Sequence, residues 1–156
     1  MAATRLIPMH TQKNCSIRKC LKDRTDYAKN DEKTNQGEFV SSYECDSKTV
    51  DKEFELSKSQ YDLFSSSRKG DIIAYQIRQS FKPGEITPEE ANQVGYETAM
   101  RWIRGKHAFI VATHIDKAHI HNHIIYNSTS LDNKQKLLII NFGRTTIRVQ
   151  RIHFIA

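Results

Sequence analysis

The amino-acid sequence predicts an α+β fold in which a mainly antiparallel sheet is flanked by helices. One observation is that strand-like segments lie on both sides of a helix whose start near Thr87 is strongly marked. The other is that the last two such segments, His107–His114 and His119–Asn127, are separated only by a tight connection at Ile115–Ala118, which is typical of a hairpin. At 156 residues, the chain has the size of one domain with its own core.

The first half of the chain is expected to alternate strands and helices. Ser16 can cap a helix, because its side-chain oxygen can accept a hydrogen bond from a free backbone N–H. Ile17, Cys20 and Leu21 then lie on one face of that helix. In order, we expect a strand at Thr4–Met9, a helix from Ser16 to about Tyr27, a loop at Asn30–Gly37, a strand at Phe39–Cys45 and a helix at Asp51–Phe64.

The second half begins with a linker at Ser65–Gly70 and a strand at Asp71–Phe81, in which Ile73, Tyr75 and Ile77 share one parity. The next helix has the clearest start in the chain. Thr87 is at the N-cap, Pro88 occupies the first helical position and Glu90 completes a capping box. An apolar face continues to about Arg104, and Gly105 fits the end of the helix before the predicted hairpin.

Composition and charge exclude several classes of protein. No apolar run approaches the roughly 18 residues of a membrane span. The N-terminus lacks the apolar region of a signal peptide, and the three cysteines form no CxxC motif, so we expect a cytoplasmic protein with reduced thiols. The net charge of +6 comes mostly from residues 133–156, which hold five basic residues and no acidic one. Net charge alone is therefore weak evidence for a nucleic-acid partner.

Histidines are concentrated in the predicted hairpin, where four of the seven lie within ten residues. His119, His121 and His123 alternate along one strand and so share a face, and a turn at Ile115–Ala118 would place His114 opposite His119. Solvent-facing or structurally paired histidines are the alternative. Converging imidazoles can bind a divalent metal ion and leave coordination positions open for a substrate. Asp116 is either a turn residue or a carboxylate that orients a ligand histidine, and the two roles are compatible.

Three motifs in this order resemble those of plasmid relaxases, the mobilisation nucleases of the HUH endonuclease superfamily. They are Tyr27 followed by Lys33-Thr34, the segment Gln79–Glu85, and His114-x-Asp116 followed by His121-Asn122-His123-Ile124. The resemblance covers about Thr4 to Asp132. It implies a five-stranded antiparallel sheet with a tyrosine over a metal ion. It also implies strand-specific nicking of DNA at an origin of transfer, with the tyrosine left on the DNA 5′ end, during plasmid mobilisation or conjugative transfer.

The same resemblance assigns roles to individual residues. Tyr27 would be the nucleophile and Asp116 would orient a ligand or accept the tyrosine proton. The implied metal is Mg or Mn, with Zn or Ni as alternatives, and the implied partners are single-stranded DNA and accessory mobilisation proteins. The remaining assignments are His114, His121 and His123 as metal ligands, His119 as an alternate ligand or phosphate contact, and Lys33, Arg78, Gln79, Ser80 and Lys82 as DNA-binding residues.

Several alternatives stay open at this level. Tyr43 is the second candidate for the nucleophile, because composition does not distinguish it from Tyr27. A metal-dependent phosphoesterase that uses water, or an inactive DNA-binding remnant of a relaxase, would carry the same histidines. After Asp132 the resemblance ends, so we expect a nuclease domain at 1–132 and an atypical basic tail at 133–156, produced by truncation or a frameshift of the gene.

Overall fold

A computed structural model describes residues 2–64, 72–134 and 136 of the chain. The predicted linker at Ser65–Gly70 and most of the tail at 133–156 lie outside these residues. Within the described part, no helix is long and apolar enough to cross a membrane.

The centre of the fold is a five-stranded sheet in the order β1-β3-β5-β4-β2, and every neighbouring pair is antiparallel. The strands are β1 (Ala3–His10), β2 (Val40–Tyr43), β3 (Ile72–Ser80), β4 (Phe109–His114) and β5 (His121–Asn127). Each predicted strand is present. The α+β fold class and the antiparallel sheet are therefore confirmed.

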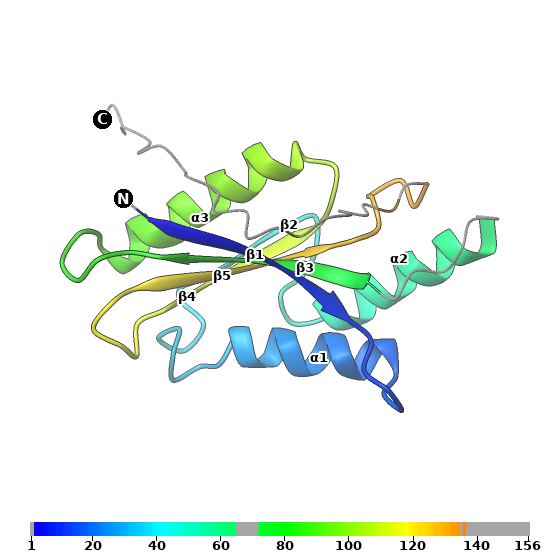
Figure 1. The fold of residues 1–156 in the computed structure, drawn as a ribbon, viewed down its shortest axis with the longest axis horizontal. Coiled ribbons are helices and arrows are strands. Elements are labelled where there is room, and N and C mark those ends of the chain that lie inside the picture. Colours follow the sequence, from blue (N-terminus) through cyan, green and yellow to red (C-terminus); the bar gives the residue numbers. More distant parts are fainter. Residues whose placement is uncertain (1, 65–71, 135, 137–156) are drawn as a thin grey trace.

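Helices cover both faces of the sheet (Figure 1). Helices α1 (Ile17–Ala28) and α2 (Val50–Phe64) pack on one face, and α3 (Pro88–Ile103) packs on the other. Both predicted N-caps are confirmed. The Ser16 hydroxyl accepts a hydrogen bond from the Lys19 backbone N–H at 3.2 Å, and Thr87 and Glu90 form the reciprocal capping box.

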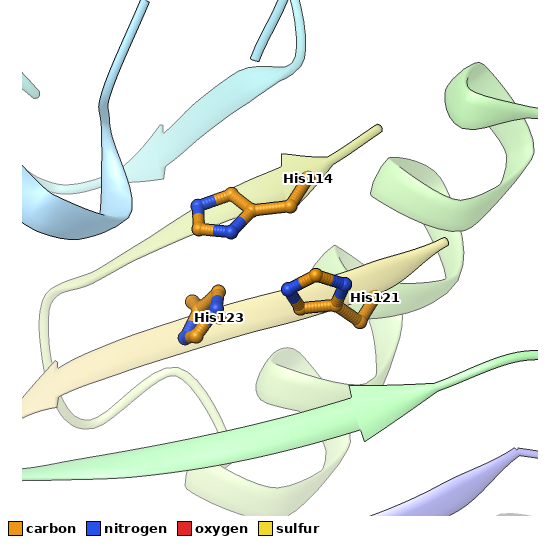
Figure 2. Close-up of side chains that lie close together, drawn as sticks. All are labelled: His114, His121 and His123. Atoms are coloured by element: carbon orange, nitrogen blue, oxygen red, sulfur yellow. The ribbon is translucent and has the colours of Figure 1, made fainter. Parts of the chain in front are cut away.

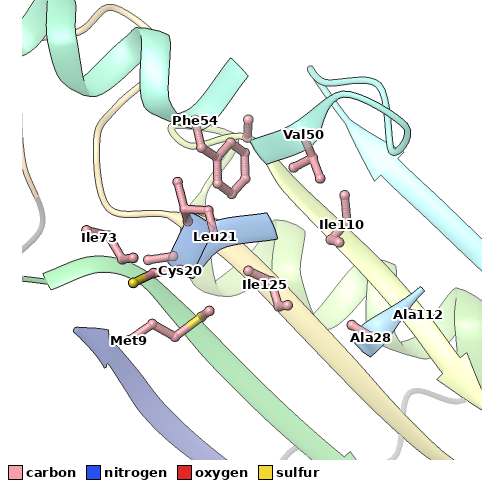
Figure 3. Close-up of a cluster of buried hydrophobic side chains, with 12 residues drawn as sticks. Met9, Cys20, Leu21, Ala28, Val50, Phe54, Ile73, Ile110, Ala112 and Ile125 are labelled. Atoms are coloured by element: carbon pink, nitrogen blue, oxygen red, sulfur yellow. The ribbon is translucent and has the colours of Figure 1, made fainter. Parts of the chain in front are cut away.

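Two hydrophobic clusters hold the three layers together. The cluster between the sheet and helices α1 and α2 includes Leu21, Phe54 and Ile125 (Figure 3), and the cluster under α3 includes Ile77 and Val111. Ile73 packs in the first cluster, whereas Tyr75 and Ile77 pack in the second, so these three residues do not share one face of β3 as their alternation predicted. The reason is a register shift in the β1–β3 ladder, where Met9 pairs with Ala74 and His10 with Ile72.

Gly95 of α3 sets how closely this helix approaches the sheet. A Cβ atom at Gly95 would lie 2.6 Å from Nδ2 of Asn122 and 2.7 Å from Cγ1 of Val111. The amide of Asn122 in turn donates to the Ala91 carbonyl and to the Gln79 side chain, and it accepts from the Thr113 hydroxyl. The contact at Gly95 therefore fixes the segment of β5 that carries the histidines.

We expect Gly95→Ala to destabilise the protein. At an exposed helical position this change would stabilise by about 1 kcal/mol, but here overpacking should reverse the sign and lower the free energy of unfolding by about 1–3 kcal/mol. Urea unfolding measures the difference. Gln93→Ala, at an exposed position of the same helix, should stay within about 0.5 kcal/mol of the parent. A Gly95→Ala variant as stable as the parent would show that α3 can move away from β5 at little cost.

Candidate active site

Three of the four predicted histidines converge on one face of the sheet. His114 ends β4, and His121 and His123 lie on β5; the ring centroids are 4.3 Å apart for His114 and His123 and 4.9 Å apart for His114 and His121 (Figure 2). One ligand atom from each residue lies within 4.8 Å of the others. We call these three residues the histidine triad, and it could hold a metal ion.

The connection between β4 and β5 is longer than the sequence indicated. His114 pairs with His121, not with His119, because β5 begins only at His121 and the connection spans Ile115–Ile120. His119 therefore lies in the connection, with its ring centroid 5.6 Å from that of His121, and it is not part of the group that could hold a metal. The prediction that four histidines share one strand face is wrong for this reason.

Each imidazole of the triad has one nitrogen engaged by a neighbouring group. His114 Nε2 lies 2.8 Å from the carbonyl oxygen of Ala28, and His121 Nδ1 lies 3.5 Å from the carbonyl oxygen of His119. His123 Nδ1 lies 2.5 Å from the amide nitrogen Nε2 of Gln76 on β3. Hydrogen bonds of this kind orient a ligand histidine and fix which nitrogen is free to bind a metal.

The opposite nitrogen of His123 has no such partner. Its Nε2 is buried and makes no hydrogen bond within the described residues. Burial lowers the pKa of His121 to about 4 and that of His123 to about 3, and it also lowers the pKa of His114. The rings are therefore neutral near pH 7, which is the form that binds metals. A buried, unpaired and neutral nitrogen beside two other histidines fits a divalent ion.

Tyr27 lies over the triad. It belongs to the last turn of α1, the residue is 58% exposed, and its ring centroid is 6.0 Å from those of both His114 and His123. Two contacts hold the end of α1 and the loop after it against the sheet, since the Ala28 carbonyl oxygen lies at hydrogen-bond distance from His114 Nε2 and the Ile115 N–H donates to the Lys33 carbonyl at 2.8 Å. The Lys33 ammonium is 4.1 Å from the centre of the Tyr27 ring.

Tyr43, the other candidate for the nucleophile, lies on the opposite face of the sheet. Its ring stacks on Phe109 at 5.3 Å, and it packs against the cluster beneath α3. Its hydroxyl donates to the Gly105 carbonyl. The geometry therefore brings Tyr27, and not Tyr43, to the histidine triad.

The predicted DNA-binding residues separate into two groups. Arg78 pairs with His123 and Ser80 pairs with His121 in the β3–β5 ladder, so both lie on the face of the triad. Lys82 is exposed in the turn after β3. Gln79 does not join them. Its side chain is fully buried on the α3 side, where it bonds to Thr98 and Asn122, because neighbouring residues of a strand point to opposite faces.

Asp116 is exposed in the connection after β4. Its charge raises the pKa values of His114 and His121 slightly, against the larger effect of burial. Within the described residues, Asp116 forms no hydrogen bond to a histidine of the triad. Its assignment as an orienting group or proton acceptor stays a prediction.

Gln76 contacts the histidine triad but was not predicted as a site residue from the sequence. It shares the parity of Arg78 and Ser80, and this alternation with Tyr75 and Ile77 was the available signal. The two orientations of its amide have different consequences. In the structure the amide N–H faces His123 Nδ1, which leaves the ring proton on Nε2, whereas an amide oxygen turned to that position accepts the Nδ1 proton and frees Nε2 for a metal.

We expect Gln76→Met to weaken metal binding about 10–100-fold, because the group that fixes the His123 tautomer is lost. Gln76→Glu keeps an acceptor for the Nδ1 proton and should bind at least as tightly as the parent. Calorimetric titration with Mn²⁺ and Ni²⁺ measures the metal affinity of both variants. Gln93→Met, at an exposed position of α3, is the matched control. An unchanged affinity in the Met variant would mean that His123 is oriented without Gln76.

An exposed tyrosine above three histidines on adjacent antiparallel strands is the arrangement that the relaxase resemblance implied. The family model of the MobA/VirD2-like relaxase nuclease domain matches residues 27–151. The chain belongs to this relaxase family. The match includes most of residues 133–156, and the separate tail proposed there stays a prediction.

Two sets of curated relatives agree with the family. The relaxase domain is 39% identical over 101 residues to protein rlx of Staphylococcus aureus, which covers 65% of this chain and 30% of that protein. It is 36% identical over 78 residues to the group II intron-interrupted relaxase LtrB of Lactococcus lactis, which covers 49% of this chain and 14% of that protein. The chain thus spans less than a third of the length of these relatives. No solved structure matches the chain.

Proposed function

We propose that this relaxase domain nicks one strand of DNA at an origin of transfer, with Tyr27 as the nucleophile and a divalent ion on the histidine triad. The observation that carries the proposal is the position of Tyr27, exposed to solvent and 6.0 Å from two rings of the triad. An exposed hydroxyl beside a metal site can reach a phosphodiester, whereas a buried one cannot. The physiological role would be plasmid mobilisation or conjugative transfer within the cytoplasm, together with accessory mobilisation proteins.

The reaction is a transesterification. The Tyr27 oxygen attacks the phosphorus and forms a phosphotyrosine ester while the bond from phosphorus to the 3′ oxygen breaks. The tyrosine proton leaves to a base, for which Asp116 is proposed, and the departing 3′ oxygen takes up a proton to become a free hydroxyl. One ester replaces another, so the step is reversible and the same residue can rejoin strands.

The triad and its cationic neighbours supply electrostatic stabilisation. A divalent ion on the triad would polarise a phosphoryl oxygen and stabilise the charge that develops in the transition state. Lys33 beside the Tyr27 ring and Arg78 beside His123 add positive charge where the phosphate would lie. Imidazole ligands favour Zn or Ni, whereas Mg prefers oxygen ligands; Mn, which the relaxase resemblance implies, is the metal of the proposal.

Capture of DNA by the protein tests this function. The chain is incubated with Mn²⁺ and a pool of labelled single-stranded oligonucleotides of random sequence, and denaturation-resistant protein–DNA complexes are isolated and sequenced. We expect captured DNA whose 5′ ends share a sequence. A metal-loaded protein that captures no DNA would contradict the proposal and favour the inactive remnant. Metal-dependent cleavage without capture would favour the phosphoesterase.

A further inference from the structure

Two arginines face each other beside the histidine triad. Arg5 of β1 pairs directly with Arg78 of β3, and Arg78 pairs directly with His123 of β5. Paired residues of an antiparallel ladder point to the same face, so His123, Arg78 and Arg5 form one row across three neighbouring strands. The row ends at β1, which is an edge strand of the sheet.

This arginine pair is unfavourable on its own. Like charges directly opposite each other in a sheet destabilise the pairing. Both side chains are exposed, and within the part of the chain that the structure describes neither forms an ion pair with an acidic residue. The structure thus provides two adjacent guanidinium groups whose charge is balanced by no carboxylate of the described fold.

We propose that Arg5 and Arg78 together bind one phosphate group of single-stranded DNA, next to the phosphate that Tyr27 attacks. This inference rests on the proposed function. The Cβ atoms of directly opposite residues lie about 4.5–5.5 Å apart, so two guanidinium groups can close on a single tetrahedral anion. Guanidinium is well suited to that ligand, because its fixed fork of donors matches the phosphate oxygens.

The position of the two arginines indicates the path of the DNA strand over the protein. A strand whose scissile phosphate lies between Tyr27 and the triad would continue over Arg78 and Arg5 and leave the protein across the edge strand β1. The contact is to the backbone and carries no base information, so it should act on every sequence alike. Its role would be to hold the strand in register with the nucleophile.

The test measures the affinity of a Tyr27→Phe protein, with Mn²⁺ present, for fluorescent oligothymidylate by anisotropy. In this background no nicking disturbs the equilibrium. We expect Arg5→Gln and Arg78→Gln each to weaken binding about tenfold at low salt. The double variant should be little weaker than either single variant, because both arginines hold the same phosphate. Its slope of log affinity against log salt should be shallower by about 0.7, the value for one phosphate on a single strand.

A control pair removes the same charge elsewhere. Arg101→Gln with Lys106→Gln changes two exposed basic residues at and just after the end of α3 and should alter the affinity less than about twofold. Additive effects of the two arginine changes, or a double variant that binds like this control, would overturn the inference. The adduct assay separates the two proposals. If the arginine double variant, made in the protein that keeps Tyr27, still forms the covalent adduct after either of these outcomes, the proposed function stands and only the phosphate site is wrong. A parent that neither binds oligothymidylate nor captures DNA would refute both.

Discussion

Replacing Tyr27 by Phe is expected to abolish the covalent protein–DNA adduct completely. The change removes a single hydroxyl from a residue that is more than half exposed, so it should alter the stability of the fold little. Affinity for metal and for single-stranded DNA should therefore stay within about twofold of the parent, as for a surface substitution. Gel analysis after denaturation measures the adduct, and calorimetry and anisotropy measure the two affinities.

Tyr43→Phe is the matched control for this experiment. It removes the hydroxyl of a tyrosine that packs beneath α3, and it should leave adduct formation unchanged. Mass spectrometry of the parental adduct should place the nucleotide on the peptide within Asp23–Lys33. A nucleotide on Tyr43 would move the nucleophile to the other face of the sheet. DNA cleavage by the Tyr27→Phe protein at the parental rate would show that water attacks instead.

Local signals in the sequence were sufficient for most of the secondary structure. The caps at Ser16 and Thr87 depend on hydrogen bonds within four residues, so the helix starts could be predicted from the order of residue types alone. Alternation of apolar residues located the strands for the same reason. The register shift near Ile73 breaks that alternation, and only the pairing of β1 with β3 reveals it.

The site was harder to predict because its geometry depends on contacts between distant segments. The beginning of β5 is set by its pairing with β4 and β3, so the connection was predicted to end two residues too soon and His119 was grouped with the triad. The Gln76 contact joins residues 47 positions apart, and the Ala28 contact with His114 joins residues 86 positions apart. No local pattern encodes either contact. The position of Tyr27 follows from the second contact, which is why composition could not select it.

Replacing His121 and His123 together by Ala is expected to remove metal binding. The two residues provide two of the three nitrogens of the triad, so affinity for Mn²⁺ or Ni²⁺ should fall by more than about a hundredfold, beyond the loss expected for a group that only orients a ligand. Adduct formation should fall with it, although Tyr27 is still present. His119→Ala is the control, and it should change the affinity only slightly because His119 lies in the connection.

The pH dependence of metal binding tests the environment of the same two residues. Protons compete with the metal only when the imidazoles protonate, and burial lowers the pKa of His121 to about 4 and that of His123 to about 3. A lowered pKa weakens that competition, so affinity should persist as the pH falls past 6.5, the ordinary histidine value, and decline only toward 4. Titrations at a series of pH values from 7.5 downward give the midpoint. A loss of affinity centred near pH 6.5 would mean that water reaches the triad freely. An unchanged affinity in the variant that lacks His121 and His123 would place the metal elsewhere.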